Sequence, residues 1–100
     1  DCLFLDPPKY GHGTDNKVWD FVRYFPLLLE KCPFLLSSQP QFIAPTVYAV
    51  NISSLTLHNT LQDLMSGWDG RTSSGDIALQ ENNRRRLLHT AKFVRWEASQ

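Results

Sequence analysis

A chain of 100 residues can form at most one small domain, and a hydrophobic fraction of 42% is sufficient for a packed core. Ten basic and ten acidic side chains cancel, so no net charge draws the protein toward a nucleic-acid backbone or an anionic membrane. Nucleic-acid binding would therefore depend on a local cluster of charge or on parts of a longer protein.

Two further features bear on location. No apolar run approaches the roughly 18 residues that a membrane-spanning helix needs, and no basic segment followed by an apolar one opens the chain. Cys2 and Cys32 are the only cysteines, and we expect them to be reduced core residues. The sequence predicts a soluble cytoplasmic protein without a membrane partner.

The first half of the chain predicts one strand and one irregular helix. Leu3, Phe4 and Leu5 form a buried strand that ends at the prolines following Asp6. Residues 11–16 have the composition of a loop, and Asp15 or Asn16 is expected to cap a helix that begins at Lys17. Its apolar residues recur at helical spacing, and Pro26 is expected to kink or break it.

The second half predicts a strand, a regular helix and a β-hairpin. Residues 41–47 form a buried strand with Pro45 at its end, and Ser53 or Ser54 caps the following helix, which Gly67 stops. Residues 76–96 alternate apolar and polar side chains around a tight turn at Asn82 and Asn83. The order predicts an α/β sheet with two parallel strands and an antiparallel finish.

The sequence "DPP" at residues 6–8 lies where such a sheet binds ligands, beyond the carboxyl end of a strand. Proline fixes φ and lacks a donor, so the Asp6 carboxylate and the Pro7 carbonyl can form a rigid pair of acceptors for an amino group. Tyr10 is available to stack on the base that carries this amine. Alternatively, the three residues simply end the strand, with Asp6 capping a turn.

Five stretches of the chain resemble one protein family. These stretches resemble the C-terminal half of a class I S-adenosylmethionine-dependent methyltransferase, and are most similar to the ribosomal RNA large-subunit methyltransferases with an Asp-Pro-Pro-x-aromatic catalytic loop. They are "LFLDPPKYGHG" at 3–13, "VW" at 18–19, "PLLLEKC" at 26–32, "TVY" at 46–48 and "GDIALQENNRRRLLHTAKFVRW" at 75–96.

The resemblance implies a Rossmann-like sheet in which residues 1–100 form the C-terminal portion of the catalytic domain. It implies S-adenosylmethionine as cofactor and a nucleic-acid base, RNA in preference to DNA, as substrate. The family's catalytic loop falls on Asp6, Pro7, Pro8 and Tyr10. The substrate-binding residues expected around that loop are Lys9, His12, Thr46 and Tyr48.

The sequence departs from the family pattern in three places. The cytosine-C5 members place a cysteine nucleophile after the next strand, where this chain reads "APTVYAVN", and Lys9 separates Pro8 from the aromatic residue. The glycine-rich turn and ribose-binding acid that hold the cofactor are also missing, and Gly11 and Gly13 follow the wrong strand for that role. We therefore expect the cofactor-binding half to lie upstream of residue 1; the alternative is a non-catalytic α/β interaction module.

Three other features have two interpretations each. Trp19 is expected to staple the start of the first helix, or else to cover the catalytic loop. Residues 84–86 are three arginines, which predict a solvated turn or, less readily, a contact with RNA phosphates. The three histidines lack the spacing of metal ligands, so no metal site is predicted.

Overall fold

The computed structural model describes residues 1–99 and confirms the α/β class. These residues form two helices and six strands, with two short 3-10 turns at Thr14–Asn16 and Cys32–Leu35. In chain order the elements are β1 (Cys2–Leu5), β2 (Tyr10–His12), β3 (Val18–Asp20), α1 (Phe21–Lys31), β4 (Phe42–Val47), α2 (Ser54–Leu64), β5 (Gly70–Gln80) and β6 (Leu87–Ala98).

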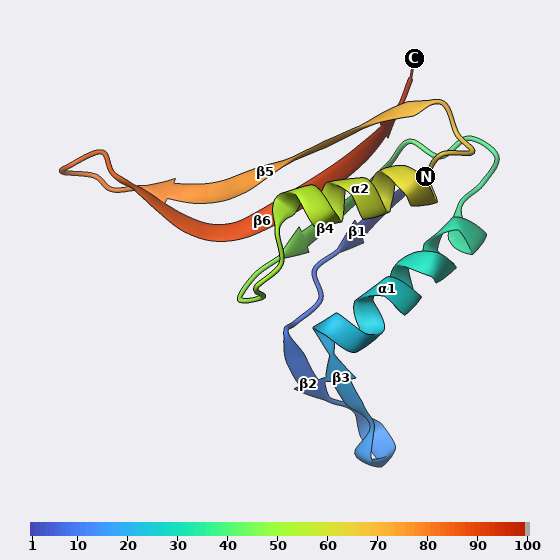
Figure 1. Ribbon diagram of the computed structural model, residues 1–100, viewed down its shortest axis with the longest axis horizontal. Coiled ribbons are helices and arrows are strands. Elements are labelled where there is room, and N and C mark those ends of the chain that lie inside the picture. The colour runs from blue at the N-terminus through green and yellow to red at the C-terminus, as the bar shows by residue number, and fades with distance from the viewer. Residues whose placement is uncertain (100) are drawn as a thin grey trace.

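Four of the strands form one sheet in the order β1-β4-β6-β5 (Figure 1). β1 and β4 are parallel, with Leu3 opposite Ile43, and β6 runs antiparallel to both β4 and β5. Because α1 connects the two parallel strands, they lie side by side with their carboxyl ends at the same edge. The predicted parallel pair with an antiparallel finish is confirmed.

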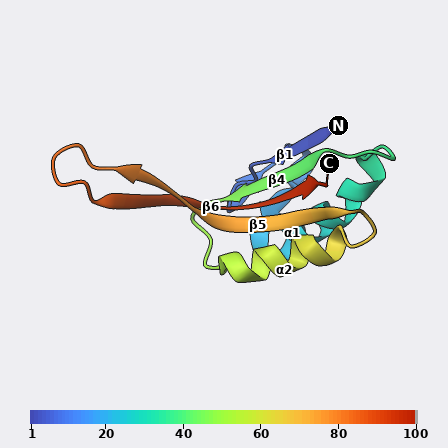
Figure 2. The same ribbon diagram turned by 90° about the horizontal axis from the view of Figure 1, so that it is seen from above.

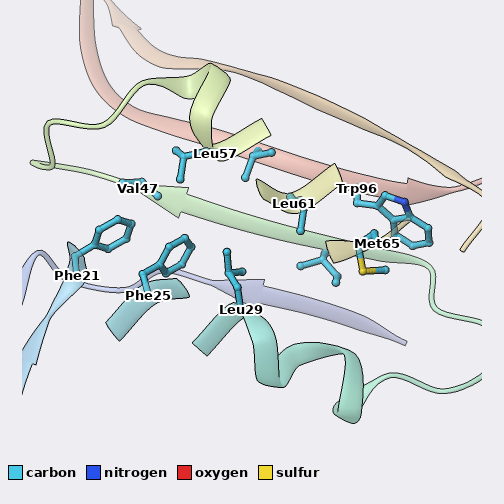
Figure 3. Close-up of a cluster of buried hydrophobic side chains, with 10 residues drawn as sticks. Phe21, Phe25, Leu29, Val47, Leu57, Leu61, Met65 and Trp96 are labelled. Atoms are coloured by element: carbon cyan, nitrogen blue, oxygen red, sulfur yellow. The ribbon is translucent and has the colours of Figure 1, made fainter. Parts of the chain in front are cut away.

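Both helices pack on the same face of this sheet (Figure 2). Phe21, Phe25 and Leu29 recur every four residues along α1, and Leu57 and Leu61 do the same in α2, so each helix buries one apolar stripe. Their side chains meet inward-pointing residues of β4 and β6 in a single core (Figure 3), which also includes Ile43, Val47, Met65, Val94 and Trp96.

Over residues 1–99, no helix covers the other face of the sheet (Figure 2). Side chains alternate between the two faces of a strand, so Leu3 and Leu5 point toward the core while Phe4 points away. Phe4 is 74% exposed, and its ring packs edge-on against Phe42 with the ring centroids 5.0 Å apart.

The region between β1 and α1 differs from the prediction. Instead of a loop and a helix start, residues 10–20 form a β-hairpin in which β2 and β3 pair, with Gly11 opposite Trp19. Asp15 and Asn16 adopt left-handed conformations with φ of 59° and 60°, so they make the turn and do not cap a helix. The helix begins at Phe21, where the Asp20 side chain accepts a 3.2 Å hydrogen bond from the Val22 amide.

Pro26 and Pro45 both lie inside regular elements, which differs from the prediction. A kink or a break was predicted at Pro26, and the helix is not broken there, since α1 continues across Pro26. Pro26 and Val22 are exposed, so water can solvate the Val22 carbonyl that lacks its helical partner. Pro45 lies inside β4, not at its end. The register of the β4–β6 pairing is the same on both sides of Pro45, but Ala44 and Pro45 do not pair with residues of β6.

The second helix begins and ends close to the residues predicted for it. Ser53 caps α2, accepting a 3.1 Å hydrogen bond from the Thr56 amide, and the helix ends at Leu64, shortly before Gly67. The C-terminal hairpin is longer than predicted, and a six-residue turn from 81 to 86 replaces the tight turn at Asn82 and Asn83.

The two cysteines differ in burial. Cys32 is buried as expected, whereas Cys2 is exposed on the open face of the sheet, so its prediction as a core residue is wrong. Among residues 1–99, no helix is long and apolar enough to cross a membrane.

Candidate functional site

The carboxyl ends of β1 and β4 bring Asp6 and Thr46 together. Leu5 pairs with Pro45, so the next residue of each strand lies at the same edge of the sheet. The Thr46 hydroxyl lies 2.8 Å from Asp6 Oδ1, to which it donates a hydrogen bond, and it also lies 3.4 Å from the Leu5 carbonyl oxygen. This contact fixes one carboxylate oxygen of an otherwise exposed Asp6 and leaves the other oxygen free to accept.

The loop after Asp6 is held by its neighbours. The Trp19 indole Nε1 donates a 2.7 Å hydrogen bond to the Pro8 carbonyl, and the Phe21 amide donates a 2.9 Å bond to the Lys9 carbonyl. Pro7 is buried, and no hydrogen bond among residues 1–99 uses its carbonyl. The loop is therefore rigid, with the Asp6 carboxylate and the Pro7 carbonyl left as acceptors.

Trp19 therefore contacts the loop after Asp6 directly. Its ring also stacks on Tyr24, with centroids 6.0 Å apart. The sequence placed Trp19 at the start of a helix, where a staple is the common role. Only the β2–β3 pairing places its indole against Pro8.

Tyr10 and His12 lie on the β2–β3 hairpin, which extends away from the sheet in Figure 1. Tyr10 is 59% exposed and pairs through its backbone with Asp20. Its ring packs edge-on against the His12 ring at 5.3 Å, and among the aromatic pairs of residues 1–99 it does not stack on Tyr48. The two predicted rings thus form one exposed aromatic pair on a projecting hairpin.

Lys9 and Tyr48 line the same open hollow, which has a volume of about 600 Å³. A separate hollow of about 770 Å³ lies at the opposite end of the sheet, where residues such as Gln39 and Trp68 line it. The hollow at the carboxyl edge has no acidic residue among those that line it. Its lining comprises Lys9, Val47, Tyr48, Ala49, Val50, Asn51, His89, Thr90 and Lys92.

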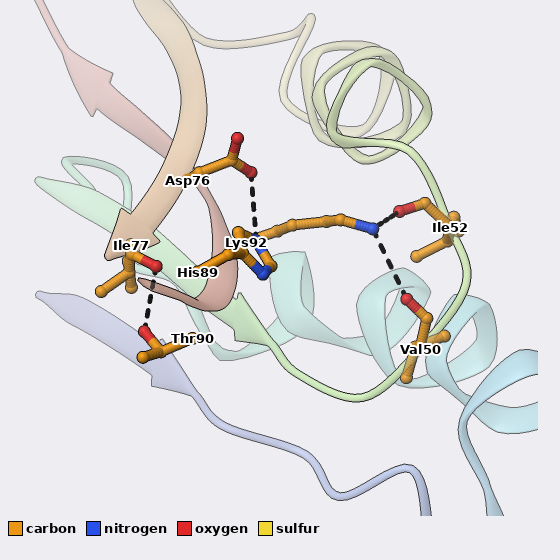
Figure 4. Close-up of polar contacts among 7 residues, drawn as sticks. All are labelled: Val50, Ile52, Asp76, Ile77, His89, Thr90 and Lys92. Atoms are coloured by element: carbon orange, nitrogen blue, oxygen red, sulfur yellow. Dashed lines mark hydrogen bonds and ion pairs between the residues drawn. The ribbon is translucent and has the colours of Figure 1, made fainter. Parts of the chain in front are cut away.

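Lys92 shapes this hollow, although no sequence motif singles it out. From β6 its ammonium group donates to the carbonyls of Val50, at 3.5 Å, and Ile52 (Figure 4). Between these contacts and β4, Ala49 adopts a left-handed conformation with φ of 57°. Lys92 thereby ties the segment that carries Tyr48 and Asn51 to the sheet. A lysine flanked by Ala91 and Phe93 was the only signal in the sequence.

His89 also reaches the hollow from β6. Its Nε2 lies 3.3 Å from an Asp76 carboxylate oxygen on the adjacent strand, and both side chains are more than half exposed (Figure 4). Because its side chain is more than half exposed, the imidazole is accessible to a ligand.

No protein-family model matches the sequence, and no curated protein matches it. Among solved structures, the chain is similar to one described as the crystal structure of the SAM dependent methyltransferase from Agrobacterium tumefaciens. The two are 32% identical, with a TM-score of 0.90 over 99% of this chain. The match covers 33% of the other protein, so this chain spans about a third of its length. Residues 1–99 thus have the fold of one part of a SAM-dependent methyltransferase.

Proposed function

We propose that this chain forms the substrate side of an S-adenosylmethionine-dependent methyltransferase that methylates a nucleic-acid base, RNA in preference to DNA. The observation that carries the proposal is the similarity, at 32% identity and a TM-score of 0.90 over nearly the whole chain, to part of a SAM-dependent methyltransferase. The preference for RNA comes from the resemblance of the "DPPKY" loop to ribosomal RNA methyltransferases.

The acceptors at the sheet edge suit an exocyclic amine. Asp6 and Pro7 offer a carboxylate and a carbonyl on a loop that Thr46 and Trp19 hold in place. Where these acceptors draw both amino hydrogens out of the plane of the base, the nitrogen becomes pyramidal and its lone pair turns out of ring conjugation. Orientation of this kind contributes to catalysis because the reacting atoms then meet at short distance without further ordering. Nitrogen is therefore the favoured target atom.

S-adenosylmethionine would supply the methyl group as an activated sulfonium. Within residues 1–99, Gly11 and Gly13 belong to the β2–β3 hairpin region, and Gly13 precedes only the three-residue 3-10 turn Thr14–Asn16, so we do not expect either glycine to cradle a nucleotide. We assign no donor contact to these residues. In this proposal, sequence outside them holds the donor, and Asp6 and Pro7 only orient and polarise the substrate.

The other predicted substrate residues have distinct roles in this proposal. Lys9 and Tyr48 lie on the hollow beside the loop, where an ammonium group and a phenol can contact a nucleotide phosphate and a base. Tyr10 and His12 form the exposed ring pair on the projecting hairpin, where they can stack against bases next to the target.

The first test is Asp6→Asn in the full-length protein, assayed by transfer of a labelled methyl group to RNA. Removing the carboxylate charge while keeping its shape is expected to reduce the turnover rate by about 100-fold or more, the range for loss of a group that stabilises the transition state. Asp20→Asn is the matched control, because asparagine caps a helix as well as aspartate does. Retention of full activity in Asp6→Asn would remove the role assigned to the carboxylate.

A second measurement separates the enzyme from a non-catalytic interaction module. Calorimetric titration of the full-length protein with S-adenosylhomocysteine is expected to show binding. Absence of binding, together with absence of methyl transfer, would favour the module.

A further inference from the structure

The C-terminal hairpin extends past the edge of the sheet that carries the candidate site. The last pair between β4 and β6 joins Val47 to Lys92, and beyond it β5 and β6 pair only with each other. We call residues 77–91 the arm. Since β6 is antiparallel to β4, the arm continues in the direction in which β4 points, past the carboxyl edge (Figure 1). Five residues of β6 extend over roughly 17 Å at about 3.4 Å per residue.

The tip of the arm carries positive charge that no acid neutralises. Glu81 forms an ion pair with Arg86 at 3.0 Å, whereas Arg84 and Arg85 have no ion pair among residues 1–99. All three arginines are exposed. In a chain with equal numbers of acidic and basic residues, this tip is a local positive pole.

Basic side chains continue from the tip to the candidate site. His89 lies on the arm and reaches the hollow, which Lys9 and Lys92 also line. Asp76, paired with His89, is the acid at the base of this path. Basic side chains that extend from the tip toward the acceptor loop have the sign of charge that binding of a nucleic-acid backbone requires.

We propose that the arm binds the phosphate backbone of the substrate strand, with Arg84 and Arg85 contacting phosphates a few nucleotides from the target base. This inference rests on the proposed function, because it takes the strand bound by the arm to be the one whose base reaches Asp6. The phosphate contacts carry no sequence information; they hold the strand in register over the site.

The exposed leucines of the arm suggest a different partner, a second copy of this chain in place of a nucleic acid. Leu79, Leu87 and Leu88 are 62–72% exposed. Leu79 lies opposite Leu88, but Leu87 pairs with Gln80, so it points to the other face of the ribbon. All three leucines line one hollow near the tip together with Glu81 and Arg86, and two arms laid tip to tip would bring unpaired guanidinium groups together. These observations favour the nucleic acid.

The test measures binding of a labelled single-stranded RNA to the full-length protein by fluorescence anisotropy over a series of salt concentrations. The variant R84A/R85A is expected to bind more weakly and to reduce the slope of log K against log salt by about 1.4, at roughly 0.7 per phosphate contact with a single strand. R71A/R95A removes the same charge from the far end of the sheet, where Arg95 pairs with Glu97 at 2.8 Å, and is expected to retain the wild-type slope.

Three outcomes would overturn the arm's role: an unchanged slope in R84A/R85A, an equal loss in R71A/R95A, or a change of oligomeric mass in L79D/L88D while R84A/R85A binds RNA normally. The last result would assign the arm to a second copy of the chain. Binding is measured without methyl transfer, so it is independent of the Asp6→Asn result. Weakened RNA binding in R84A/R85A would support the arm even if Asp6→Asn retained activity.

Discussion

Asp6 and Thr46 are 40 positions apart and share one hydrogen bond, and Trp19 reaches Pro8 in the same way across 11 positions. A single hydrogen bond of this kind contributes about 1 kcal/mol to folding. Its larger effect at this edge is orientation, because the two contacts fix a loop whose prolines already restrict the backbone. At the scale of single residues, the candidate site is therefore defined by a few contacts between distant parts of the chain.

Cys32 provides a test of single-residue burial away from that site. Burial raises the pKa of its thiol, and Sγ donates to the Leu28 carbonyl at 3.3 Å. The folded state thus favours the protonated thiol, so its contribution to stability is complete below the unfolded pKa and is lost as the pH rises through the raised value. As the pH rises above about 9, the free energy of unfolding of the wild type is therefore expected to fall relative to that of Cys32→Ala.

Denaturant unfolding over a series of alkaline pH values measures this difference. Cys2→Ser is the control, since Cys2 is exposed and its replacement is expected to leave the pH dependence unchanged. Parallel pH curves for wild type and Cys32→Ala would show that burial of the thiol has no such effect.

At the scale of elements, the β2–β3 hairpin is the principal departure from the sequence prediction. Val18, Phe21, Val22 and Phe25 follow helical spacing, yet the helix includes only the last three. Val18 and Trp19 instead pair with His12 and Gly11 across a turn of left-handed residues. Helical periodicity describes which side chains share a face, but it does not show where the helix begins. The start of α1 is marked instead by its cap, Asp20.

The β5–β6 pairing gives a prediction at this scale. A Cβ at Gly70 would collide with the Glu97 carbonyl and the indole of Trp96, whereas a Cβ at Gly67 would meet nothing within 4 Å. Gly70→Ala is therefore expected to destabilise the protein by roughly 1–3 kcal/mol, the cost of overpacking, and Gly67→Ala by much less. Chemical denaturation of both variants checks this, and equal effects would contradict the close packing around Gly70.

At the scale of the whole molecule, both helices cover one face of the sheet and leave the other open (Figure 2). The arm and the β2–β3 hairpin project separately from the packed part (Figure 1). The candidate site lies at the edge from which the arm projects, so its accessibility follows from the arrangement of the sheet.

The open face predicts how residues 1–100 behave when expressed alone. Phe4 and Phe42 form an exposed aromatic pair there, and we expect this chain to bind a hydrophobic dye such as ANS. Phe4→Glu should reduce the dye fluorescence. Phe34→Glu is the control, because Phe34 is 89% exposed but lies in the turn after α1. An equal reduction in both variants would show that the dye does not report on the sheet face.

The sequence by itself determined the α/β class, the two parallel strands, a helix cap at Ser53 or Ser54 and the position of Asp6 at a strand end, because periodicity, capping residues and prolines act locally. It did not determine that Pro45 lies inside β4 or that α1 continues across Pro26. Those depend on which backbone groups the neighbouring elements or solvent satisfy.

Only the tertiary structure placed Trp19 on the Pro8 carbonyl, Lys92 on the loop after β4, and Arg84 and Arg85 on an arm beyond the carboxyl edge. Each of these arrangements joins segments that are distant in the chain or depends on where pairing between strands ends. No local pattern specifies such contacts, because they arise from the register and order of the sheet as a whole.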